Sequence, residues 1–84
     1  MDKKTESVLD PLVAAIADIL DTKQHKAKIS DIALAESVGL SVQSVRRYIA
    51  GTRDMPASAF AKITKALDLD AEAVINEALQ SLGE

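Results

Sequence analysis

The segment from Ile29 to Arg53 carries two start signals and two stop signals for helices, and their spacing constrains the fold of the 84-residue chain most strongly. Ser30 and Ser41 suit helix N-termini, because a serine hydroxyl accepts a hydrogen bond from a backbone N–H of the first turn. Gly39 and Gly51 suit helix ends, because glycine lacks the Cβ that disfavours the left-handed conformation. The pattern predicts two short helices joined by a tight turn, which is a helix-turn-helix.

The second of these helices, expected over residues 41–50, separates apolar from polar side chains. At about 100° per residue, Val45, Tyr48, Ile49 and Ser41 share the side that would face a core. In a helix-turn-helix the second helix enters the major groove, where Arg can pair with guanine O6 and N7 and Gln with adenine N6 and N7. The opposite side holds Gln43, Arg47 and Ala50, with Arg46 on one flank and Val42 near the exposed N-terminal end.

Two kinds of DNA contact are expected around this helix. We expect base edges to be read by Val42 (through a thymine methyl), Gln43 and Arg47, and a base or a phosphate to be contacted by Arg46. Phosphate contacts fix the register of a protein on the duplex without reading its sequence. We assign that role to Ser41, Ser44, Thr52, Arg53 and Lys28.

Charge is segregated along the chain. The total is −3, which taken alone argues weakly against a nucleic-acid partner. Residues 1–21 and 54–84 are acidic, with net charges of −3 and −4, whereas residues 22–53 hold six basic and two acidic side chains and are +4. The one positive block therefore coincides with the expected motif, as a protein needs if a single face is to meet phosphate.

Several short stretches around the two helices match one known family. They are Leu34-Ala35-Glu36, Gly39-Leu40-Ser41, Val45-Arg46-Arg47-Tyr48, Gly51, Pro56, Ile63 and Ala66-Leu67. Over residues 29 to 75 the chain resembles the phage-repressor (Cro/C1-type) helix-turn-helix family. The resemblance implies an all-α, compact five-helix bundle of the lambda-repressor-like type, with the motif at about residues 30–50, that binds an operator, usually as a dimer. The chain departs from the family at Asp31, where a phosphate-clamping glutamine is common, and in residues 22–28, which look longer than the usual link.

The rest of the chain predicts one domain over residues 7–84, after a flexible stretch at residues 1–6. A first helix is expected from Ser7 to about Asp21, with Pro11 in its first turn, followed by a polar, basic link at residues 22–28 that contains a solvated His25. Two further helices are expected over residues 57–67 and from Asp70, as its cap, to about Leu82. The apolar stripe of the first helix consists of Leu9, Leu12, Val13, Ile16, Ile19 and Leu20.

The last predicted helix carries an apolar stripe that continues to its end. One interpretation is that the whole stripe packs in the core of a single domain. The other is that the far end forms a weak homodimer interface, which the family resemblance favours. The residues expected in that interface are Val74, Ile75, Leu79 and Leu82.

Composition argues against several other classes of protein. No cysteine is present and His25 is the single histidine, so neither a disulfide nor a metal site is expected, and the Asp68-x-Asp70 spacing lacks the glycine and glutamate of a calcium loop. No catalytic triad, P-loop or nucleotide-binding glycine loop is present, so we expect no enzyme, no cofactor and no small-molecule ligand. No apolar run approaches a membrane span or a secretory signal, which predicts a soluble, cytoplasmic protein without a membrane partner.

These observations predict a sequence-specific transcriptional regulator that binds double-stranded DNA, such as a phage or prophage repressor or a Cro-like protein. The alternative is a protein-interaction module on the same fold, such as an antitoxin or an anti-repressor. The net acidity and the long C-terminal stripe favour that alternative.

Overall fold

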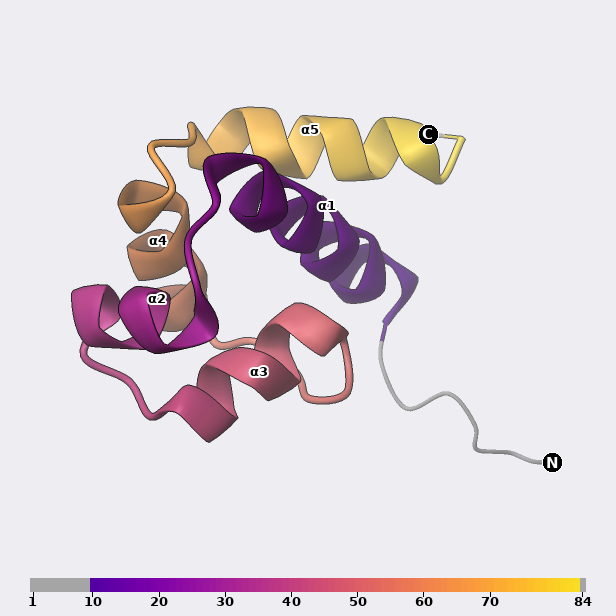
Figure 1. The fold of residues 1–84 in the computed structure, drawn as a ribbon. Helices are drawn as coiled ribbons and strands as arrows, with labels where there is room; N and C mark the ends of the chain where they lie inside the picture. Colours follow the sequence, from indigo (N-terminus) through magenta and orange to yellow (C-terminus); the bar gives the residue numbers. More distant parts are fainter. Residues whose placement is uncertain (1–9, 84) are drawn as a thin grey trace, which may run out of the picture.

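Residues 10–83 are described by the computed structural model, and they form five helices and no strand (Figure 1). The all-α, five-helix prediction is therefore confirmed. The prediction of a flexible stretch at residues 1–6 lies outside the described residues, as do Ser7 and Leu9. The helices are α1 (Pro11–Ala27), α2 (Asp31–Val38), α3 (Val42–Ala50), α4 (Ala57–Ala66) and α5 (Ala71–Ser81).

The predicted caps of the two central helices are present. The Ser30 hydroxyl accepts a hydrogen bond from Ala33 N at 3.1 Å, and the Ser41 hydroxyl accepts one from Ser44 N at 3.0 Å. Gly39 and Gly51 both take the left-handed conformation, with φ of 72° and 75°, where each helix ends. Local sequence signals thus fix both ends of α2 and of α3.

The predicted link at residues 22–28 is wrong, because α1 continues through Ala27. The segment contains neither glycine nor proline, and Lys and Gln are good helix formers, so polarity alone does not end the helix. Lys28 then takes the left-handed conformation (φ 58°) and reverses the chain. At the other end, α1 begins at Pro11 rather than Ser7, with Asp10 as its cap accepting from Leu12 N at 2.7 Å.

The core lies where the helices converge. α1 packs against both α3 and α5, α2 packs against α3 and α4, and α4 also contacts α5. Figure 1 shows α3 and α5 on opposite sides of α1, so α5 leaves the outer side of α3 uncovered. The largest completely buried side chains are Leu20, Leu34, Val45 and Ile63, one from each of α1 to α4.

The apolar stripe of α5 is divided between core and surface. Val74 (3% exposed) and Ala78 are core residues, whereas Ile75 and Leu79 are half-buried and Leu82 is 40% exposed. Because Val74 offers almost no surface to a partner, the expected dimer surface is corrected to Ile75, Leu79 and Leu82. The end of the apolar stripe at Leu82 is the part that the core leaves most exposed.

Candidate nucleic-acid interface

α3 presents the polar face that its sequence predicts. Val45, Tyr48 and Ile49 are buried in the core, whereas Gln43 and Arg47 are exposed one helical turn apart on the outer side. The remaining expected readers are placed at the margins of this face, with Arg46 exposed and Val42 half-buried and packed against the core. Four side chains suited to groove contacts therefore lie on one helix, held in place by its buried side.

Ser41 and Ser44 are joined to each other at the N-terminus of α3. The Ser41 hydroxyl donates to Ser44 Oγ at 2.9 Å while it accepts from Ser44 N. Since capping occupies the Ser41 hydroxyl, its expected phosphate contact would break this pair. The Ser44 hydroxyl keeps its own hydrogen for an acceptor outside the protein.

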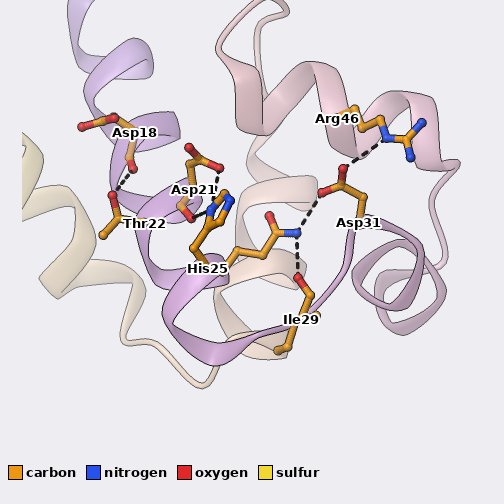
Figure 2. A network of polar contacts seen from close by, with 8 residues as sticks. Asp18, Asp21, Thr22, His25, Ile29, Asp31 and Arg46 are labelled. Atoms are coloured by element: carbon orange, nitrogen blue, oxygen red, sulfur yellow. Dashed lines mark hydrogen bonds and ion pairs between the residues drawn. The ribbon is translucent and has the colours of Figure 1, made fainter.

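Arg46 forms an ion pair that the sequence reasoning missed. Its Nε donates to Asp31 Oδ2 at 3.1 Å, across the turn between α2 and α3 (Figure 2). The other oxygen of Asp31 accepts from the side-chain amide of Gln24 at 2.8 Å. In the sequence, Asp31 is notable only as a departure from the family pattern, and Gln24 lies within the predicted link at residues 22–28. Residues 22–28 contain neither glycine nor proline, which is compatible with continuation of α1, but the contact of Gln24 with Asp31 also depends on the turn at Lys28.

Electrostatics at this junction favour an ionised Asp31. The hydrogen bond from Gln24 lowers the pKa of Asp31 from its ordinary value of 3.8, and the Arg46 guanidinium lowers this pKa further. A carboxylate with a lowered pKa is charged at neutral pH. The three side chains consequently form a fixed polar chain from α1 through α2 to α3.

His25 lies in the last turn of α1 and is exposed, so it is solvated as predicted but helical rather than in a loop. Its Nδ1 lies 2.9 Å from the Asp21 backbone oxygen and 3.3 Å from Asp21 Oδ1. These two Asp21 groups raise the pKa of His25 above 6.5, the backbone contact contributing most. This local i,i+4 contact belongs to the exposed surface of α1, and we assign it no chemistry.

The expected phosphate contacts outside α3 lie in the segments beside it. Thr52 and Arg53 are exposed in the loop after α3, where Thr52 Oγ1 lies 3.4 Å from the Arg47 carbonyl oxygen. Lys28 is exposed at the end of α1 and borders a surface hollow of about 660 Å³ that Asp31 and Arg46 also line. Two exposed cations, Lys28 and Arg53, therefore lie in the segments that flank the helix-turn-helix.

Neither a metal-ligand cluster nor a membrane-length apolar helix is present among residues 10–83. These residues contain no group of three or more His, Asp or Glu side chains placed to hold a metal ion. None of their helices combines the length and apolarity that crossing a membrane requires.

Comparison with known proteins adds no family assignment. No protein-family model matches the chain, and no curated protein is significantly similar to it in sequence.

Proposed function

We propose that this chain is a sequence-specific transcriptional regulator that binds double-stranded DNA with α3 in the major groove. One observation carries the proposal. α3 is capped at Ser41, ends at Gly51, packs through its apolar side, and turns Gln43 and Arg47 outward one turn apart. A short, rigid helix that presents Gln and Arg is suited to reading adenine and guanine edges.

The surrounding charges support the same proposal. Lys28 and Arg53 are exposed beside α3, and residues 22–53 are the one block of the chain with a positive charge. Cations in these places would neutralise phosphates and set the register, while the acidic remainder of the chain would be repelled from the duplex. The DNA would then meet the protein in one orientation.

The sequence resemblance indicates which kind of regulator this chain would be. A repressor of phage or prophage type, or a Cro-like protein, acting as a weak homodimer in the cytoplasm, fits the match over residues 29 to 75. One observation supports the alternative of a protein-interaction module. Ile32 on α2 is 57% exposed, whereas large apolar side chains are usually covered. A single exposed side chain is a weak signal, and DNA binding remains the better-supported function.

Selection of bound sites from a random double-stranded DNA library tests the proposal. We expect enrichment of one short motif, repeated in inverted orientation if the protein binds as a dimer. The double variant Gln43→Ala with Arg47→Ala should abolish enrichment, whereas Lys65→Ala, which removes one exposed charge from α4, should preserve it. Absence of any enriched site, together with a stable complex with another protein, would favour the interaction module instead.

A further inference from the structure

Three helices meet at the side chain of Asp31. Gln24 Nε2 uses both of its hydrogens, donating to Ile29 O at 3.0 Å and to Asp31 Oδ1 at 2.8 Å. Gln24 is only 4% exposed, so it has little freedom to move. The position of one Asp31 oxygen is thus set from inside the protein.

Space filling does not explain why a glutamine stands here. Its Oε1 is buried and has no hydrogen-bond partner within the described residues. An unpaired buried oxygen lowers stability, and an apolar side chain of similar length would fill the space without that loss. The amide is explained instead by what its nitrogen holds, namely Ile29 O and Asp31.

The second oxygen of Asp31 holds Arg46 at one point only. Oδ2 accepts from Nε at 3.1 Å, and Figure 2 shows the terminal nitrogens of Arg46 extending away from Asp31. The Arg46 side chain is 59% exposed, so this outward edge is accessible. A guanidinium is a planar fork of donors, and fixing Nε orients the whole fork.

The charge of Asp31 decides which DNA group suits this fork. A phosphate at the outward edge of Arg46 would face a nearby carboxylate and be repelled, whereas guanine O6 and N7 are neutral acceptors. Arg46 also lies one turn from Gln43 and beside Arg47 on α3, so its edge joins the face already described. Holding an arginine in place before binding reduces the side-chain entropy lost on binding.

We propose that Asp31, itself fixed by Gln24, is a positioning residue that orients the Arg46 guanidinium for bidentate contact with a guanine edge. This inference rests on the proposed DNA binding. Simple electrostatics predicts that removal of a carboxylate near DNA tightens binding to every duplex. The proposal predicts instead that removal of the Asp31 carboxylate weakens binding to the selected site. The fixed arginine instead makes Asp31 necessary for selectivity.

A double-mutant cycle on the full chain tests this proposal, with the site enriched from the random library and an unrelated duplex as probes. Asp31→Asn should weaken binding to the selected site about 5- to 20-fold and flatten preference at one guanine position. The same variant should bind the unrelated duplex as tightly as wild type or more tightly. In an Arg46→Ala background, Asp31→Asn should no longer weaken binding to the selected site.

Glu36→Gln is the matched control, because it removes an equal charge from an exposed position of α2. It should keep base preference unchanged. If Asp31→Asn tightened binding to both duplexes by the same factor as Glu36→Gln, Asp31 would only be a charge near DNA and the proposal would be overturned. Equal effects of Asp31→Asn with and without Arg46 would overturn it too.

A measurement without DNA separates this proposal from the proposed function. In the free protein, the Arg46 Nε–H should exchange slowly with solvent by nuclear magnetic resonance, and exchange should accelerate in Asp31→Asn and in Gln24→Met but not in Glu36→Gln. Circular dichroism melts would verify that each variant is folded. If wild type selected no DNA site, the proposed function would fail, and guanine reading with it. Rapid Nε–H exchange in a wild-type protein that does select a site would overturn the positioning role alone.

Discussion

Gln24 donates its buried amide to Asp31 at 2.8 Å, and this contact joins the last turns of α1 to the first turn of α2. The chain reverses between these residues at Lys28, whose left-handed conformation takes the place that glycine often fills. Because Asp31 also pairs with Arg46, the two contacts connect the start of α2 to both α1 and α3. If α3 reads DNA as proposed, the same carboxylate contributes both to stability and to selectivity.

The stability of the fold should depend on the ionisation of Asp31. Its pKa is lowered in the folded state, so its contribution is present above the ordinary value of 3.8 and is lost as the pH falls through the lower, folded-state pKa. We expect Asp31→Asn to lose about 1 kcal/mol of unfolding free energy at neutral pH, a modest value because the pair is partly exposed. The difference from wild type should narrow as the pH is lowered from neutral to well below 3.8 in urea titrations. A difference that stays constant over that range would contradict this.

Arg47 should behave as a base reader. It is exposed opposite Val45 on α3, so its guanidinium is accessible to an external partner. Arg47→Ala should cost about 1–3 kcal/mol in binding the selected site and relax preference at one base position. Binding measured on a panel of single-base variants of the site would show this. Retention of full affinity and selectivity would remove Arg47 from the interface.

Arg53 should act on phosphate instead. It lies in the loop just after α3, beyond the helical face that is proposed to meet base edges. Arg53→Ala should weaken binding to every duplex by a similar factor and make the logarithmic salt slope shallower by roughly one unit. Lys65→Ala removes the same charge from α4 and should alter neither quantity. Loss of preference at one base position with an unchanged slope would assign Arg53 to base reading.

Lys28 offers a test that separates folding from binding. A lysine in the left-handed conformation carries a steric cost that glycine avoids. We expect this cost to exceed the loss of stability that glycine causes by increasing the entropy of the unfolded chain. Lys28→Gly should therefore raise the unfolding free energy by about 0.5 kcal/mol. The same variant should bind DNA more weakly and with a shallower salt slope. A variant that gained stability without losing affinity would show that Lys28 does not contact phosphate.

Features that depend on neighbouring residues could be predicted from the sequence, whereas contacts between separate helices could not. The caps at Ser30 and Ser41 and the burial of Val45, Tyr48 and Ile49 depend on neighbours within one or two turns, and these predictions are confirmed. Ser41, expected on the same side as these three residues, is exposed. Residues 22–28 were misassigned because polar composition does not reveal that a helix continues. The contact of Gln24 with Asp31 requires that continuation, and the ion pair with Arg46 requires the packing of three helices. Neither can be inferred from local patterns.

The stripe on α5 shows the same limit. Helical spacing groups Val74 and Leu82 on one side, but the placement of the helices packed against α5 decides that Val74 is covered and Leu82 is not. A sequence pattern therefore predicts that a face is apolar without predicting where the core ends. That boundary decides which residues remain available to a second subunit.

Self-association is expected through the exposed end of α5. Ile75 and Leu79 are half-buried and Leu82 is exposed, so a second copy could cover surface that the monomer leaves open. Pairing two reading helices would allow them to occupy half-sites about one helical turn, ~34 Å, apart. One helix alone makes few contacts, whereas a linked pair binds the second half-site at a high effective concentration. A weak dimer should therefore bind a palindrome much more tightly than a single half-site.

Leu82→Lys is the sharpest test of this dimer. A cation is favourable near a helix C-terminus, so the variant should melt at nearly the same temperature as wild type while sedimentation shows less dimer. Ile32→Lys makes the same kind of change at an exposed apolar side chain on α2 and should leave the dimer fraction unchanged. Leu82→Lys should also lose more affinity for a palindrome than for a half-site. A wild-type protein that stays monomeric at high concentration and occupies one half-site would refute the dimer. A large loss of thermal stability in Leu82→Lys with unchanged association would instead place Leu82 in the core.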